Sequence, residues 1–234
     1  MDKKKKVIGI IGGMGPAATA ELFKRIIDNT DAKSDAEHIH IIIDNYPQIP
    51  DRTQAILNNS NEPVKFVVES GNRLTKAGAE FLLIPCNTSH YYFDEIQAGV
   101  NVPVINMIEE TAKFCADNGY NKVGVLATNG TIKTGVYGKA LQKFGIDAVY
   151  PSEEGQKEVM SVIYDYVKAG KTADTTKLAV HLKEMEKQNV KAFILGCTDL
   201  PLALNDGDYG LKFIDTIDVL AKSGIVNANY KIKD

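Results

Sequence analysis

Leu82-Leu83-Ile84-Pro85-Cys86-Asn87-Thr88 and Phe193-Ile194-Leu195-Gly196-Cys197-Thr198 have the same form: an apolar run, a proline or glycine, a cysteine and then short polar side chains. Each apolar run has the length and composition of a buried strand that ends at its cysteine. Because the two segments match so closely, we interpret them as two copies of one element in a duplicated chain.

Two further pairs of segments repeat in the same order along the chain. Residues 7–11 resemble residues 123–126, and residues 104–109 resemble residues 213–218. Three matches in one order, at nearly constant spacing, favour a duplicated lobe over coincidence between short apolar strands.

Apolar runs alternate with segments of helical periodicity along the whole chain, a pattern typical of an α/β fold. We therefore predict two pseudo-symmetric lobes with mostly parallel sheets flanked by helices. The N-terminal lobe comprises residues 1–105 plus 211–234, and the C-terminal lobe comprises residues 106–210. More locally, we expect a buried strand over 39–43, a strand over 102–105, helices over 134–144 and 152–168, and a loop over 47–53.

Composition narrows the class of protein. The chain has 234 residues, of which 44% are hydrophobic and 24% charged, as in an ordinary soluble domain. A net charge of -3 gives no basic excess for nucleic acid. No apolar stretch approaches the ~20 residues that span a bilayer, and we identify no signal peptide. We predict a cytoplasmic protein whose three cysteines are free thiols.

The positions of Cys86 and Cys197 suggest a function. In open α/β sheets, ligands bind beyond the carboxyl ends of the strands. If the two lobes face each other, these cysteines would meet across one cleft, and we place the active site in that inter-lobe cleft. Cys115 instead lies in the helical segment 108–117 without polar neighbours, and we interpret it as a core residue.

Two opposed thiols suit one reaction in particular. Inverting a stereocentre needs a base on one face and an acid on the other, and a thiolate and a thiol can exchange these roles. With each sulfur roughly 3–3.5 Å from the carbon, the two lie about 7 Å apart, too far for a disulfide. A metal site is not predicted, because the Cys-x-x-Cys spacing and a nearby histidine pair are lacking.

Two other segments favour binding of a carboxylate. Gly12-Gly13-Met14-Gly15-Pro16 ends a strand and opens a helix, whose N-terminus favours an anion, and the glycine signatures of nucleotide sites are absent. In the segment 47–53, two prolines stiffen a loop that would present Arg52 for bidentate binding. The duplication makes the turn at Thr128 the counterpart of the Gly12 turn. Lys168 ends a helix, where a cation is common for reasons of stability alone.

Together, Gly12-Gly13-Met14-Gly15-Pro16, Pro50-Asp51-Arg52-Thr53, Pro85-Cys86-Asn87-Thr88 and Gly196-Cys197-Thr198 resemble the motifs of the aspartate/glutamate racemase family, most closely its aspartate racemase branch. The resemblance covers nearly the whole chain. It implies a cofactor-independent, PLP-independent racemase that acts on a small-molecule amino acid and forms a homodimer. Cys86 and Cys197 would be the acid/base pair, and substrate would contact Met14, Arg52, Asn87, Thr88, Thr128, Lys168 and Thr198.

The chain departs from the family pattern at one position. The family often carries Gly-Cys-Thr-Glu at the second site, whereas this chain has Gly-Cys-Thr-Asp, which ends in Asp199. We place Asp199 beside the second thiol, outside direct contact with substrate. Its shorter side chain would alter the rate or the substrate range if it orients Cys197.

Three alternatives stay open at this point. The enzyme could be a racemase of broad specificity rather than one for aspartate or glutamate. A related isomerase or decarboxylase of small dicarboxylic acids would use the same scaffold. A non-catalytic two-lobed binding protein for small acids would share the duplicated architecture but would need no reactive thiol.

Overall fold

The computed structural model describes residues 4–233 and divides the chain into two compact units. The first unit contains the chain up to Glu110 together with the C-terminal segment from Ile217, and the second unit contains Thr111–Thr216. Strand β7 (Phe213–Asp215) pairs within the sheet of the second unit, so the division falls after Thr216 rather than after Gly210.

The first unit is built on a parallel sheet with the strand order β2 (Ile41–Asn45), β1 (Ile8–Gly12), β3 (Phe81–Leu83). Ile8 pairs with Ile41 on one side and with Phe81 on the other. The predicted strand over 102–105 is reduced to one parallel bridge, between Leu82 and Val104. This bridge extends the sheet by one further position beyond β3.

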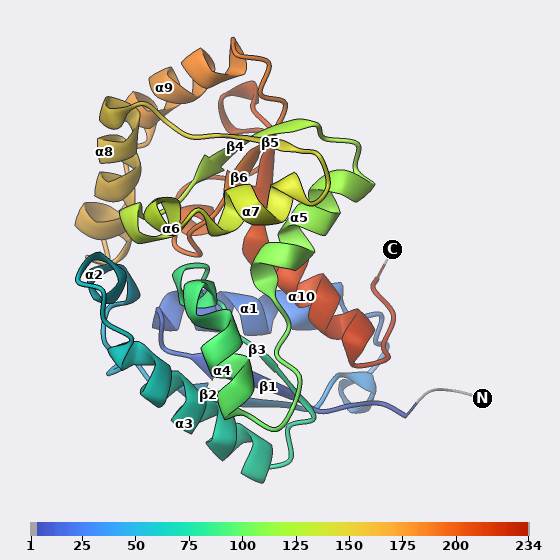
Figure 1. Ribbon diagram of the computed structural model, residues 1–234. Coiled ribbons are helices and arrows are strands. Elements are labelled where there is room, and N and C mark those ends of the chain that lie inside the picture. Colours follow the sequence, from blue (N-terminus) through green and yellow to red (C-terminus); the bar gives the residue numbers. More distant parts are fainter. Residues whose placement is uncertain (1–3, 234) are drawn as a thin grey trace. The chain divides into compact units, whose positions relative to one another are not determined.

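Helices cover both faces of this sheet (Figure 1). Along β1, Ile8 and Ile10 pack in a cluster with α1 (Pro16–Asn29) and α10 (Thr216–Asn227). Ile11 packs in a second cluster with α3 (Glu62–Lys76) and α4 (Phe93–Gly99). Successive strand residues point to opposite faces, so both faces of the central strand are apolar and buried.

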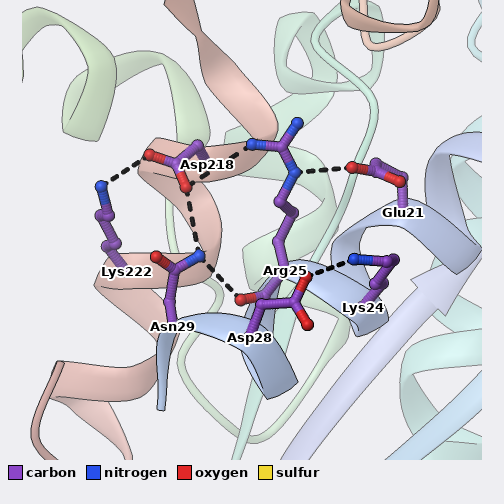
Figure 2. Close-up of polar contacts among 7 residues, drawn as sticks. All are labelled: Glu21, Lys24, Arg25, Asp28, Asn29, Asp218 and Lys222. Atoms are coloured by element: carbon purple, nitrogen blue, oxygen red, sulfur yellow. Dashed lines mark hydrogen bonds and ion pairs between the residues drawn. The ribbon is translucent and has the colours of Figure 1, made fainter. Parts of the chain in front are cut away.

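Polar side chains tie the C-terminal segment of the first unit to α1 (Figure 2). Asp218 of α10 accepts a hydrogen bond from Asn29 at 3.2 Å, pairs with Lys222 at 2.8 Å and lies 3.8 Å from Arg25. Arg25 also pairs with Glu21, and Lys24 pairs with Asp28. Exposed ion pairs contribute about 0–1 kcal/mol each, so the apolar contacts of α10 in the core hold this segment more strongly.

The second unit has a parallel sheet with the strand order β5 (Asp147–Val149), β4 (Lys122–Leu126), β6 (Phe193–Leu195), β7. Residues from β4, β6, β7, α8 (Glu153–Ser161) and α9 (Thr176–Glu186) share one apolar cluster. The remaining helices of this part of the chain are α5 (Met107–Asp117), α6 (Asn129–Thr134) and α7 (Val136–Gln142).

Both sheets follow the same strand order. β1, β2 and β3 correspond to β4, β5 and β6, and the Val104 bridge corresponds to β7. The predicted α/β class with two parallel sheets flanked by helices is confirmed, and the duplication is visible in the topology. As a result, the two cysteine segments follow corresponding strands, β3 in the first unit and β6 in the second.

Several local predictions need correction. The strand over 39–43 is an edge strand rather than a buried one, and Ile43 is 38% exposed. The helix predicted over 134–144 is the shorter α7, which begins after Gly135; this glycine has a φ of 65° and separates α7 from α6. The helix over 152–168 is α8 followed by a π-helical turn, η3 (Val162–Val167).

Short 3₁₀ segments complete the secondary structure: η1 (Asp35–Glu37), η2 (Thr88–Tyr92), η4 (Leu200–Leu202) and η5 (Asp208–Gly210). Within residues 4–233, no helix combines the length and the apolar character needed to span a bilayer.

Candidate functional site

The Gly12 turn of the first unit is held by Thr19. The Gly13 N–H donates to Thr19 Oγ1 at 3.0 Å, and that hydroxyl donates to the Gly15 carbonyl at 2.9 Å. Gly13 has a φ of 90°, and a Cβ there would lie 2.3 Å from the carbonyl carbon of Tyr46. Only glycine suits this position. The turn therefore packs directly against the segment that leads to Arg52, and Met14 is buried in it.

Arg52 is the first residue of a short helix, α2 (Arg52–Leu57), so the predicted loop over 47–53 ends before it. Its Nη1 donates to the carbonyls of Ile49 at 3.0 Å and Pro50 at 2.9 Å. Its Nε is buried and has no hydrogen-bond partner among the described residues. The guanidinium is thus anchored by one nitrogen and retains an unused buried donor, which suits an incoming carboxylate.

Cys86 follows β3 and lies close to the Gly12 turn. Its side chain belongs to the same apolar cluster as Met14 and Ile49, and the Ser89 hydroxyl donates to the Met14 sulfur at 3.4 Å. The first unit therefore brings together its predicted site residues Met14, Asn87 and Thr88 with the thiol, on loops at one end of the sheet.

His90, for which the sequence favours a helix cap over a role in orienting a neighbour, fixes the backbone at Cys86. Its Nδ1 lies 2.9 Å from the Cys86 carbonyl, and its Nε2 accepts from the Met107 N–H at 3.1 Å. Since a carbonyl only accepts and an N–H only donates, the ring is neutral with its proton on Nδ1. Burial lowers the pKa of His90 below 6.5. In the sequence, His90 is only one polar residue among several after Cys86, and this pattern does not reveal its two backbone partners.

We expect His90 to make stability depend on pH. A histidine whose pKa is lower in the folded than in the unfolded state binds fewer protons when folded, so its contribution is complete above pH 6.5 and is lost as the pH falls below that value. In urea unfolding from pH 8 to pH 5, the wild-type protein should lose more stability than His90→Asn. The exposed His40→Gln serves as the matched control and should follow the wild type. Equal slopes for wild type and His90→Asn would contradict the assignment.

Thr128 occupies the corresponding turn of the second unit. It caps α6, and its hydroxyl accepts from the Thr131 N–H at 3.3 Å. Gln156 of α8 donates to the Ala127 carbonyl at 2.9 Å and to Asn129 Oδ1 at 2.8 Å. This turn is therefore held in place by α8, as the Gly12 turn is held by Thr19.

Cys197 lies beside an ion pair whose carboxylate is buried and whose ammonium is partly exposed. The thiol donates to Asp199 Oδ2 at 3.6 Å, and the same oxygen lies 2.8 Å from Lys168 Nζ. Lys168 directly follows the π-helical turn η3. The structure thus joins three predicted site residues of the second unit. Thr198, which lies between Cys197 and Asp199 in the sequence, is also buried.

The ring of Tyr137 packs against Gly196, the residue before Cys197. A side chain at Gly196 would lie 3.0 Å from the Tyr137 ring, so glycine permits this close packing. Burial raises the pKa of Tyr137, and its hydroxyl stays neutral.

Cys115 behaves as the core residue that the sequence suggests. It lies fully buried in α5, and burial raises the pKa of its thiol to about 12. Such a thiol is protonated at neutral pH and is a poor nucleophile.

A cavity of about 620 Å³ opens between α6 and α8 in the second unit, with walls that include Tyr150, Met160 and Tyr164. None of the predicted site residues lines it, although the Lys168 ammonium lies 5.7 Å from the Tyr164 ring. Among the described residues, no group of three His, Cys, Asp or Glu side chains could hold a metal ion.

Comparison with known proteins relates both units to one family. The family model described as Asp/Glu/Hydantoin racemase matches residues 11–224. The broad specificity amino-acid racemase RacX of Bacillus subtilis is 30% identical, over 94% of this chain and 96% of RacX. The structure of Picrophilus torridus aspartate racemase is similar with a TM-score of 0.85 at 32% identity, covering 97% of this chain and 96% of that one. An aspartate racemase homologue from Pyrococcus horikoshii gives a TM-score of 0.78 at 28% identity, covering 95% and 99%. The chain belongs to the Asp/Glu/hydantoin racemase family.

Proposed function

We propose that this racemase is PLP-independent and interconverts the L and D forms of an acidic amino acid, with aspartate as the first substrate to test. Cys86 and Cys197 transfer the Cα proton. The observation that carries this proposal is their equivalent placement: each follows the corresponding strand of a duplicated sheet and is buried in a polar loop.

The two thiols act on opposite faces of one Cα. One sulfur starts as a thiolate and takes the proton, and the electron pair of the C–H bond remains on the carbon as a carbanion. The second sulfur, a thiol, gives its proton to the opposite face. The first sulfur ends as a thiol and the second as a thiolate, so the enzyme is then in the form that runs the reverse reaction.

Arg52 holds a substrate carboxylate through its unused donor, and Lys168 is the candidate for a second carboxylate. A dicarboxylic substrate matches two cationic groups. The other proposed contacts are Met14, Asn87 and Thr88 from the first unit and Thr128 and Thr198 from the second.

Hydrogen exchange tests the proposal directly. In deuterated water the enzyme should racemise L-aspartate, and deuterium should enter the D product ahead of the remaining L substrate, because each face has its own proton donor. NMR of the Cα position and chiral chromatography measure label and configuration together. The absence of exchange with any amino acid at high enzyme concentration would refute the proposal.

A second candidate is a racemase of broad specificity, which the similarity to RacX over 94% of this chain favours. The same exchange assay over a panel of L-amino acids separates the two. Narrow specificity predicts exchange with aspartate or glutamate alone, whereas broad specificity predicts exchange with neutral and basic amino acids as well.

We also propose that the protein is a cytoplasmic homodimer, as the family resemblance implies. Light scattering during size-exclusion chromatography should give twice the chain mass of 25.6 kDa. A single chain mass at micromolar concentration would contradict the dimer, and recovery of the native protein outside the cytoplasmic fraction would contradict the location.

A further inference from the structure

The duplicated cysteine motifs differ two residues after the cysteine. Thr88, a neutral residue, occupies this position after Cys86, and Asp199 occupies it after Cys197. The Asp199 carboxylate is only 6% exposed and lies 3.6 Å from the Cys197 sulfur. The two thiols therefore differ in the charge placed at the same point of the repeat.

The carboxylate can only accept a hydrogen bond when it is ionised, so Cys197 must be the donor in this contact. A thiolate in its place would put two negative charges 3.6 Å apart in a buried setting, which disfavours the thiolate. Tyr137, which also acts electrostatically on Cys197, stays uncharged because burial raises its pKa. The arrangement therefore favours a protonated Cys197.

Lys168 acts on Cys197 with the opposite sign. Its ammonium lies 2.8 Å from the Asp199 oxygen that accepts from the thiol, so its positive charge offsets part of the negative charge that the sulfur faces. Without Lys168, the carboxylate would disfavour the thiolate more strongly. The ion pair thus sets how firmly Cys197 keeps its proton.

We propose that Asp199 and Lys168 are a positioning pair that holds Cys197 as the acid in the resting enzyme, so that Cys86 is the resting base. This inference rests on the proposed two-thiol racemisation. The two thiols of a chemically symmetric reaction would then be inequivalent, and Asp199 would be the residue that keeps Cys197 protonated.

Alkylation of the two thiols tests the pair without turnover. Iodoacetamide at pH 7.5, followed by peptide mass spectrometry, gives a separate rate for each cysteine. Cys86 and Cys197 are both buried, at 5% and 8% exposure, so a comparison of each thiol with its own rate in the variants below removes the effect of access. We expect Cys86 to react about tenfold faster, the change that a tenfold larger thiolate fraction produces. The fully buried Cys115 is the internal control and should stay unmodified.

Variants of the two residues should shift the Cys197 rate in opposite directions. Asp199→Asn removes the acceptor charge and should raise the rate about tenfold, whereas Lys168→Met should lower it. Lys157→Met, which removes an exposed lysine paired with Glu153 in the same unit, should change neither thiol. Equal rates for Cys86 and Cys197 in the wild type would overturn the inference. A shift in the same direction for both variants would do so too, because simple loosening of the loop has that effect.

Kinetics provide a second readout that a structural role would not move. Racemisation has an equilibrium constant of one, so kcat/KM is equal in both directions and any asymmetry appears as matched changes in kcat and KM. We expect the wild-type enzyme to have unequal kcat values for the two enantiomers, and Asp199→Asn should bring these values closer together. Unequal alkylation in a protein without exchange activity would refute the proposed function alone, whereas normal exchange with equal alkylation would refute only this inference.

Discussion

Replacing either Cys86 or Cys197 with alanine should reduce kcat for racemisation about 1000-fold in both directions. General acid–base groups contribute about 10²–10⁴-fold each, and a racemase without its base or its acid on one face has no second route across the stereocentre. Initial rates with L- and D-aspartate, followed by circular dichroism, give the measurement.

Cys115→Ala is the matched control for this prediction. It removes the third thiol of the chain from the core of α5, and its thiol, with a pKa raised to about 12 by burial, has no part in the proton transfer. We expect wild-type kcat and a somewhat lower melting temperature. If both single variants at Cys86 and Cys197 keep more than a tenth of the wild-type rate, the assignment of the acid/base pair is wrong.

Each single variant also identifies the face that its remaining thiol serves. Cys197→Ala retains Cys86, so it can still exchange the Cα hydrogen of one enantiomer without inverting it. Cys86→Ala should exchange the other enantiomer. Exchange of the same enantiomer by both variants would contradict opposed thiols.

The repeated topology could be predicted from the sequence because it depends on strands buried on both faces. Residues 7–11 and 81–84 are continuous apolar runs, and such runs mark central parallel strands. The corresponding apolar runs in the second half, residues 123–126 and 193–195, follow each other in the same order. The edge position of β2 could not be predicted, since Ile41, Ile42 and Ile43 are as apolar as a central strand.

The helices that the sequence analysis missed lack a clear amphipathic period. α10 is apolar over most of its length and fills the core with Ile217, Leu220 and Ile225. α2 has only six residues and follows Pro50, which reads as part of a loop. The π-helical turn η3 differs from an α-helix by a shift in hydrogen bonding that side-chain spacing does not encode.

The candidate site shows the same division between local and tertiary information. Both cysteines and their polar neighbours are contiguous in the chain, so the sequence identifies them. The contact between Lys168 and Asp199 joins residues that are far apart in the chain. The π-helical turn directly before Lys168 determines the position of its backbone, and side-chain spacing does not reveal that turn. The pairing of His90 with the Met107 N–H likewise depends on where α5 starts.

Replacing Arg52 with lysine should raise KM for aspartate about 100-fold and change kcat less. Lysine keeps the charge, but its donors all radiate from one nitrogen. It therefore cannot place one donor group at the carbonyls of Ile49 and Pro50 and another at the separate position that Nε occupies. A hydrogen bond to a charged group contributes about 1.5–3 kcal/mol, which corresponds to roughly 10–150-fold in binding. Steady-state kinetics in both directions measure the effect.

Arg73→Lys is the matched control, since Arg73 lies in the same unit and its side chain is 43% exposed and paired with Asp44 and Glu69. We expect its KM to equal that of the wild type. An unchanged KM in Arg52→Lys would mean that another group holds the substrate carboxylate.

A comparison of substrates decides which carboxylate Arg52 binds. Asparagine has the α-carboxylate of aspartate but an amide in place of the side-chain carboxylate. If Arg52 binds the α-carboxylate, Arg52→Lys should weaken exchange of asparagine and aspartate by the same factor. If it binds the side-chain carboxylate, the variant should weaken aspartate alone and so narrow the preference of the enzyme for an acidic substrate. Because Nη1 already donates to the carbonyls of Ile49 and Pro50, we expect the unused Nε to be the donor that the bound carboxylate meets in either case.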